Sequence, residues 1–249
     1  VTYTTSSGPC APRTVEVVER PAVDQVTLRY IYPVYTELEA EVGEAGKGTA
    51  KAVIGTRVRV GARFNQKVAS ARIAATGNQP SDMQMDTVGK DPFASGDFIV
   101  SKDGSYQISL ESRHVRRDAT GKEHVFPFKN VVPARFGIKA VPDKAPTVRV
   151  SQPGTDLDVM PGAVVPIKAE VRDDFGVASA AIKYGVSNEE GDKDILLSSE
   201  NFRQRTVPLT HEWDLSKLEL KPGLAVSYRI EARDLRDKPG PNVGSSEVY

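Results

Sequence analysis

The chain has 249 residues, of which 39% are hydrophobic and 27% charged, so it can form two folded domains of ordinary size. Its 33 basic residues balance its 33 acidic residues, which argues against nucleic acid as a partner because phosphate neutralisation needs a basic surplus. No apolar run approaches the roughly 18 residues that cross a bilayer. The lone cysteine, Cys10, excludes an intramolecular disulfide.

The first residues show neither an initiating methionine nor a signal peptide, since Val1 opens directly into strand-like sequence. We therefore expect the chain to be a piece of a larger protein. Two β-rich runs, 1–5 and 13–19, flank the turn SSGPCAP, which predicts a hairpin over residues 1–20.

Beyond residue 20, short alternating segments recur about every 8–14 residues between turns rich in Gly, Pro and Asp. In the first half, strands are expected at 23–31, 49–54, 56–64, 68–75, 83–87, 97–101, 105–110, 124–128 and 135–140. In the second half, they are expected at 147–150, 164–172, 177–186, 194–197, 202–213, 224–232 and 245–249. One helical turn is expected at 215–218, capped by Asp214. This spacing predicts an all-β fold of tandem immunoglobulin-like β-sandwiches.

The same series of patterns runs through the chain twice. Matching segments keep their order: 55–60 with 162–167, 68–73 (VASARI) with 177–182 (VASAAI), and 104–108 with 226–230. Such self-similarity indicates tandem copies of one domain. We expect one sandwich at 21–142 and a second at 143–249, joined within the proline-containing stretch 139–153.

Residues 1–20 fit this repeat in two ways. Residues 1–4 (VTYT) match 226–229 (VSYR), so 1–20 can be the final hairpin of a preceding copy whose beginning is missing. In the alternative, they form an extra hairpin that belongs to the first sandwich.

Two tyrosines occupy matching positions on strands that enter the core. Tyr106 and Tyr228 are expected to act as tyrosine corners, with the ring packed inside and the hydroxyl bonded to backbone. Two residues later, where antibody domains carry their second cysteine, the chain has Ile108 and Ile230. Apolar packing is therefore expected in place of the disulfide.

The order of these motifs carries a resemblance: YPVYT, a Gly-Thr-led strand, VASARI, DGSYQI, a D-x-x-P joint, DDFGV, and HEWDL followed by VSYRIEARD. It resembles the immunoglobulin-like repeats of large, mostly uncharacterised bacterial extracytoplasmic proteins, which are often membrane-anchored. The resemblance covers nearly the whole chain and implies a periplasmic or cell-surface location with a structural or binding role. Because its motifs mark turns and core strands, it implies no catalytic residues.

Several aspartates could meet around turns near the domain ends: Asp143, Asp173, Asp174, Asp234 and Asp237. Loop carboxylates suit Ca²⁺, which takes about six to eight oxygen ligands. However, no D-x-D-x-D-G loop is present, and aspartate is a routine turn former. The sequence therefore favours metal-free turns without a cofactor and leaves calcium as a secondary hypothesis.

The remaining catalytic motifs are incomplete. Residues 174–176 spell the magnesium-binding DFG of kinases, but no Gly-rich phosphate loop accompanies them, so a turn is favoured. His114, His124 and His211 lack the spacing of metal ligands. No strained nucleophile turn of the G-x-S-x-G type is present. We therefore predict that the chain is not an enzyme.

A basic patch is the first candidate binding feature. Arg113, Arg116 and Arg117, with Lys122, could meet an anionic polymer or an acidic loop of a partner. The alternative is a solvated hairpin tip.

Aromatic residues offer the second candidate. Trp213 could stack on carbohydrate, but the alternation in HEWDL places it with Leu209 on a face that points to the core. Tyr32 and Tyr35, on either side of Pro33, are then the best exposed aromatics.

The favoured function is a non-catalytic structural spacer or protein-interaction segment of a larger bacterial envelope protein. Its partner would be a protein or an envelope polymer, and the segment itself would not contact the membrane. Two alternatives stay open: a ligand-binding module for carbohydrate or calcium-dependent adhesion, and accessory domains of an enzyme whose catalytic part lies elsewhere.

Overall fold

The computed structural model describes residues 4–5, 8–9, 15–80, 82–85, 92–118, 120–187, 189–198 and 203–249. These residues form strands joined by turns and two short 3-10 helices, η1 (Val34–Thr36) and η2 (Leu215–Leu218), so the predicted all-β fold is confirmed. In this described part of the chain, no helix has the length and apolarity that a membrane span requires.

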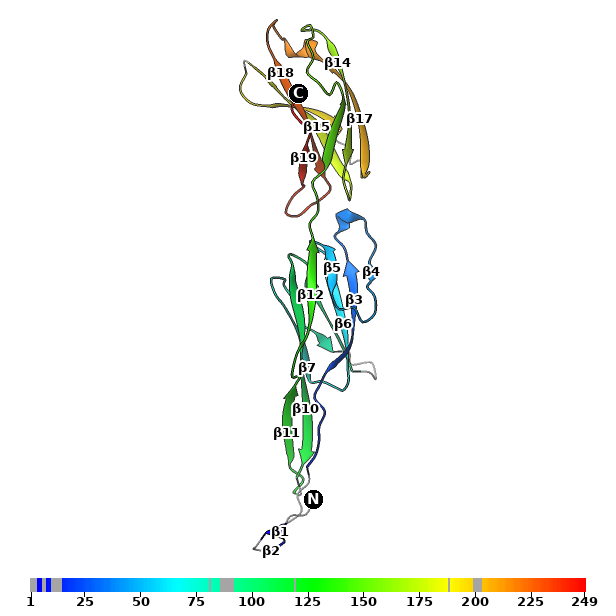
Figure 1. The fold of residues 1–249 in the computed structure, drawn as a ribbon, viewed down its shortest axis with the longest axis vertical. Helices are drawn as coiled ribbons and strands as arrows, with labels where there is room; N and C mark the ends of the chain where they lie inside the picture. The colour runs from blue at the N-terminus through cyan, green and yellow to red at the C-terminus, as the bar shows by residue number, and fades with distance from the viewer. Residues whose placement is uncertain are drawn as a thin grey trace. The chain divides into compact units, whose positions relative to one another are not determined.

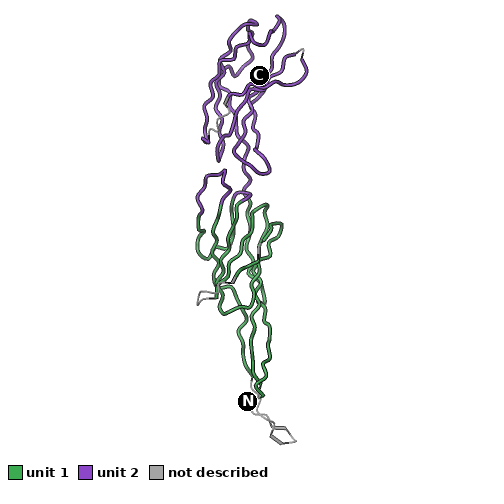
Figure 2. The backbone as a smooth tube through the Cα atoms, turned by 180° about the vertical axis from the view of Figure 1, so that it is seen from behind, with its two compact units in different colours: residues 1–31, 41–52, 56–140 green, residues 32–40, 53–55, 141–249 purple. Residues whose placement is uncertain are grey.

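Two compact units divide the chain (Figure 2). Unit 1 comprises residues 1–31, 41–52 and 56–140, and unit 2 comprises residues 32–40, 53–55 and 141–249. The sequence boundaries at 20/21 and 142/143 stay predictions.

Unit 1 contains two sheets of five strands each (Figure 1). The first has the order β4 (Glu41–Val42), β3 (Val23–Ile31), β6 (Arg57–Phe64), β9 (Phe93–Ile99) and β8 (Gln84–Met85). The second has the order β11 (Glu123–Lys129), β10 (Gly104–Arg117), β12 (Ala134–Val141) and β5 (Ala50–Val53), with β7 (Ser70–Ala75) also paired to β10.

The core of unit 1 follows from strand alternation. On β6, Val58 and Val60 are fully buried while the residues between them are exposed, as a side-chain period of two requires. From the first sheet, Phe98 packs on Tyr106 of the second, with ring centroids 5.2 Å apart. Contact between rings from different sheets makes unit 1 a sandwich.

Unit 2 contains a sheet of three strands and a sheet of four (Figure 1). The first has the order β13 (Thr147–Gln152), β14 (Val164–Arg172) and β17 (Thr206–Asp214). The second has the order β16 (Lys193–Ser198), β15 (Val177–Val186), β18 (Val226–Asp234) and β19 (Val243–Ser245). One hydrophobic cluster draws residues from both sheets, so unit 2 is also a sandwich.

The predicted helical turn in unit 2 is confirmed as η2. The carboxylate of Asp214 accepts a hydrogen bond from the Ser216 amide at 3.0 Å, which satisfies a backbone donor at the start of the turn.

Motifs that match in sequence occupy strands with matching partners. Ile73 on β7 lies opposite Ile108 on β10, and Ile182 on β15 lies opposite Ile230 on β18. Ile108 and Ile230 both have an exposed fraction of 0%, so apolar packing occupies the positions where antibody domains carry a cysteine.

The predicted N-terminal hairpin is wrong in its second strand. β1 (Thr4–Thr5) pairs antiparallel with β2 (Gly8–Pro9) rather than with 13–19. Residues 15–20 form no strand. At the end of this segment, the side-chain amides of Asn65 and Gln66 donate to the carbonyls of Arg20 and Glu19. Cys10 lies outside the described residues, and the origin of residues 1–20 in a preceding copy stays a prediction.

Candidate functional site

Four of the predicted aspartates lie close enough in unit 2 for their charges to interact: Asp143, Asp173, Asp174 and Asp234. We call these four residues the acidic cluster. The fifth, Asp237, is exposed on the loop after β18.

Two members of the acidic cluster organise turns, as the sequence suggested for aspartate. Asp173 accepts hydrogen bonds from the amides of Phe175 and Gly176 at 2.9 and 2.7 Å, which builds the DDFG turn. Asp234 accepts from the amide and the side chain of Asn242 at 2.8 and 2.7 Å, which ties the loop back to β18. The interpretation of residues 174–176 as part of a turn is therefore confirmed.

Asp143 differs from its neighbours because its charge is poorly compensated. Both carboxylate oxygens are buried without a hydrogen bond of ordinary geometry. Burial, and then the charge of Asp234, raise the pKa of Asp143 to about 6, while the nearby Tyr35 hydroxyl acts in the opposite direction. Burial also raises the pKa of Asp173, although its two backbone hydrogen bonds oppose that rise.

A metal site does not follow from this cluster. In the part of the chain that the structure describes, no three His, Cys, Asp or Glu side chains are grouped closely enough to hold a metal ion. Asp234 and Asp173 direct oxygens to backbone amides, and Asp174 is exposed. Calcium binding by these residues stays a prediction.

The predicted basic patch lies on a hairpin formed by residues 111–117 of β10 and 123–129 of β11, which we call the arm. Arg113, opposite Pro127, and Arg117, opposite Glu123, share one face of the arm, while Arg116 lies on the other face. The three arginines therefore do not form one surface, because side chains alternate across a strand. In Figure 1 the arm extends beyond the other strands of its sheet.

Acidic partners within the arm offset part of its basic charge. Arg117 donates to Glu123 at 2.7 Å. At the tip, Asp118 accepts from the hydroxyl of Thr120 and lies 2.9 Å from His124. These two contacts, Thr120 first, lower the pKa of Asp118 to about 2. The side chain of Lys122 is exposed, and its backbone N–H donates a hydrogen bond to the Asp118 carboxylate at 3.1 Å.

The arm also carries exposed apolar side chains, which were not predicted from the sequence. Val115 lies opposite Val125 on the face with Arg113, and their exposed fractions are 50% and 54%. Phe126, opposite His114, is 45% exposed on the other face. The alternation in these strands could have revealed both faces, had the pairing of 111–117 with 123–129 been known.

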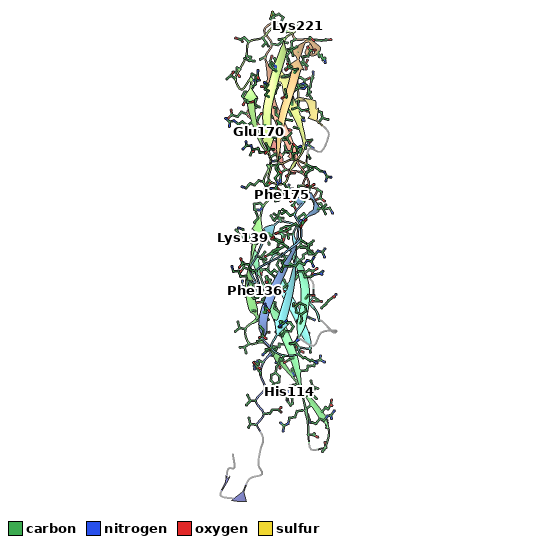
Figure 3. All side chains as sticks on the ribbon, turned by 90° about the vertical axis from the view of Figure 1, so that its right-hand side faces the viewer. His114, Phe136, Lys139, Glu170, Phe175 and Lys221 are labelled. Carbon is green, nitrogen blue, oxygen red and sulfur yellow. The ribbon has the colours of Figure 1, made fainter. Side chains whose placement is uncertain are left out.

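One face of the arm is partly covered by the segment before β3. The Glu16 carboxylate lies 3.3 Å from Nε2 of His114, which Figure 3 labels on this hairpin. Arg20 donates to the carbonyl of Lys129 at 3.3 Å. The face with Val115 and Val125 has no such contact in the described residues.

The predicted aromatic candidates are less exposed than expected. Tyr32 and Tyr35 are half-buried, and the Tyr35 ring packs edge-on against Phe175 with centroids 6.0 Å apart. Trp213 has an exposed fraction of 4%, so its expected place in the core is confirmed. His211, in the same strand, is half-buried.

A pocket of about 920 Å³ in unit 2 was not foreseen from the sequence. Its walls come from loop 153–161, loop 220–225 and the aromatic residues Trp213, Tyr228 and Tyr249. Lys221, on the second loop, lies at one end of unit 2 (Figure 3). The indole N–H of Trp213 and the hydroxyl of Tyr228 are buried without a hydrogen-bond partner. The tyrosine-corner prediction is therefore right for the Tyr228 ring and wrong for its hydroxyl.

Comparison with known proteins adds little to this geometry. No protein-family model and no curated protein matches the chain. Fibronectin(III)-like modules of CbhA from Clostridium thermocellum match 80% of this chain and 88% of theirs, with 15% identity and a TM-score of 0.25. A chimeric titin Z1Z2–Z1Z2 tandem matches 79% of this chain and 93% of its own, with 10% identity and a TM-score of 0.22. At such scores, the fold assignment rests on the strand pairing described above.

Proposed function

We propose that this chain is a non-catalytic structural and protein-interaction segment of a larger bacterial envelope or cell-surface protein. The two sandwiches would act as spacers, and the arm of unit 1 would contact the partner, a protein or an envelope polymer. The motif resemblance supports the location, and the arm supports the interaction role.

The observation that carries this proposal is the exposure of apolar side chains on a hairpin with little core of its own. An isolated two-stranded hairpin is at best marginally stable in water. Val115, Val125 and Phe126 nevertheless stay about half exposed on it. Exposed apolar side chains flanked by Arg113 and Arg117 fit a partner surface that is apolar at its centre and acidic at its rim.

A second function, calcium-dependent ligand binding, is favoured by Asp143, whose buried carboxylate lies beside the Tyr35 hydroxyl and among the charges of the other three aspartates of the acidic cluster. A bound cation would compensate this charge. The arm experiment below separates the two functions because it is run with and without Ca²⁺.

Binding of the full chain to isolated bacterial cell envelopes tests the proposal. The double variant Val115→Ser/Val125→Ser should lower the bound fraction about tenfold, since interface centres carry most of the binding energy. Val243→Ser, which removes a 47% exposed valine from β19 of unit 2, serves as the matched control and should bind like the unchanged chain.

Equal binding by the arm variant and the control would refute the role of the arm. Binding that disappears on removal of Ca²⁺ but survives the arm variant would support the calcium-dependent function instead.

A further inference from the structure

The first sheet of unit 1 carries a group of arginines on the face that points away from the core. On β6, Arg57 and Arg59 alternate with buried valines and are exposed. Arg29 on β3 lies directly opposite Arg59, and Asp97 on β9 lies opposite the same residue on its other side. Residues opposite one another in a sheet share a face, so three arginines and one carboxylate lie together. We call these four residues the basic face.

Asp97 is shared between the two arginines of β6. Arg59 donates from Nε and Nη2 to the two carboxylate oxygens of Asp97 at 3.1 and 3.4 Å. Nη1 of Arg57 lies 3.5 Å from the same carboxylate. The side chains of Arg57 and Arg59 nevertheless stay 54% and 52% exposed. One carboxylate between two arginines leaves a positive surplus even before Arg29 is counted.

Arg29 adds to this surplus at a cost to the sheet. It is exposed, and no acidic side chain in the described part of the chain pairs with it. Residues directly opposite in an antiparallel pair have Cα atoms roughly 4.5–5.5 Å apart, and like charges so placed are destabilising. An anion held between Arg29 and Arg59 would turn this repulsion into attraction. The pairing therefore points to a ligand rather than to a role in folding.

The neighbours of the basic face are apolar or small. Ile31 on β3 and Ile99 on β9 lie on either side of Arg57 and are 39% and 43% exposed. Further along β6, Gly61 is covered by the Phe93 ring, since a Cβ on Gly61 would approach Cζ of that ring to 2.8 Å. Among the described outward positions of β3, β6 and β9, Phe93 is the one aromatic residue. The face thus offers charge and apolar contact without an open aromatic platform.

We propose that the basic face binds a linear envelope polymer of polyol or sugar units joined by phosphodiesters. Phosphate fits better than carboxylate, because its oxygens can accept hydrogen bonds from two guanidinium groups on neighbouring strands at once. The Cα atoms of Arg57 and Arg59 are roughly 6.8 Å apart along the strand, so successive charges of an extended polymer can each meet an arginine. Nucleic acid fits less well, because single strands are held largely by bases stacked on open aromatic side chains.

The choice of an envelope polymer rests on the proposed location of the chain. The site itself lies on a different sheet from the arm and does not depend on the role of the arm. The two are read separately, because Val115→Ser/Val125→Ser should bind the polymer as tightly as the unchanged chain does.

Titration of the full chain with poly(glycerol phosphate) at low ionic strength, followed by calorimetry, tests the proposal. Arg29→Gln should weaken binding about tenfold, which is the worth of one charge-assisted hydrogen bond. It should not lower the melting temperature, because it removes a like-charge pair. Arg72→Gln is the matched control, since it removes the same charge from an exposed position on β7 in the other sheet, and it should bind within about twofold of the unchanged chain.

Two further variants separate ligand binding from general damage to the sheet. Asp97→Asn should tighten binding about threefold, because it frees the guanidinium groups of Arg57 and Arg59 for the ligand. Arg29→Lys keeps the charge without the planar fork and should bind between the unchanged chain and Arg29→Gln.

The proposal is overturned if poly(glycerol phosphate) does not bind, if Arg29→Gln and Arg72→Gln lose affinity equally, or if Asp97→Asn weakens binding. Two other polyanions, compared at equal charge concentration, test the chemistry of the ligand. Hyaluronate that binds as tightly would overturn the preference for phosphate. Oligothymidylate that binds as tightly would overturn the choice of a polyol or sugar polymer.

Discussion

The two units hold a tyrosine at matching positions, but the hydroxyl groups of these tyrosines have different surroundings. In unit 1 the Tyr106 hydroxyl donates to the carbonyl of Gly48 at 2.5 Å, whereas in unit 2 the Tyr228 hydroxyl is buried without a partner beside a pocket. Both rings are buried, and each tyrosine lies on a strand that pairs with the strand carrying the matching VASARI or VASAAI segment, β7 in unit 1 and β15 in unit 2. The difference therefore lies in the segment before β6 in unit 1 and before β14 in unit 2. Gly48 leads into β5, which belongs to the sheet of Tyr106, whereas residues 153–163 of unit 2 form no strand.

The close contact between Gly48 and the Phe136 ring leads to the prediction with the largest expected change in stability. Gly48→Ala should destabilise unit 1 by about 2–3 kcal/mol, because the added methyl overlaps the ring and overpacking forces a shift. Gly162→Ala is the matched control in unit 2, since nothing lies within 4 Å of the added Cβ there. Calorimetry should show a lower melting temperature for unit 1 alone, with unit 2 assigned by Trp213 fluorescence. Equal shifts in the two variants would show that Gly48 is not a packing constraint.

Removing the two hydroxyls separately gives the sharpest contrast. Tyr106→Phe should cost unit 1 about 1.5 kcal/mol, because the buried Gly48 carbonyl loses its donor. Tyr228→Phe should leave unit 2 unchanged or slightly more stable, since the hydroxyl it removes has no partner. Urea unfolding of each variant, followed by amide exchange for unit 1 and Trp213 emission for unit 2, measures both. A similar loss in the two units would contradict the contrast.

The smallest expected effect concerns the acidic cluster of unit 2. The pKa of Asp143 is raised in the folded state to about 6 from 3.8, so the folded protein binds this proton more tightly than the unfolded chain. The contribution of this carboxyl group to the stability of unit 2 is therefore fully present below about pH 4, and it is lost as the pH rises through about 6. At pH 8, Asp143→Asn should raise the melting temperature of unit 2 by roughly 4 °C, which corresponds to about 1 kcal/mol in the free energy of unfolding after allowance for solvent screening. At pH 4, the same substitution should change the melting temperature by almost nothing.

Asp237→Asn is the control for this substitution because Asp237 is exposed on a nearby loop. A gain at pH 8 that persists at pH 4 would contradict the role of the Asp143 charge. A rise in melting temperature with Ca²⁺ that Asp143→Asn abolishes would show that the carboxylate holds a cation.

Local patterns were enough to predict most strands and their buried faces. Tyr106 and Ile108 alternate with polar residues on β10, and both are buried as that period requires. The Asp214 cap and the turn at Asp173 were also predictable, because each hydrogen bond spans only two or three residues.

Long-range features could not be predicted in the same way. Gly48 precedes Tyr106 by 58 residues, and nothing near the tyrosine indicates which carbonyl its hydroxyl reaches. Arg113, Arg116 and Arg117 looked like one patch because they are neighbours in sequence, whereas the strand divides them between two faces. The burial of the Asp143 oxygens depends on residues that come from distant turns, so sequence spacing gave no sign of it.

β10 gives the arm a mechanical connection to the core of unit 1. The strand continues without a break from Gly104 to Arg117, and its first half pairs with both β7 and β12. A partner that pulls on the arm along its length loads these pairs in shear, so that many hydrogen bonds share the force at once. Tension at the tip would therefore pass along β10 to β7 and β12, the strands that pair with its first half.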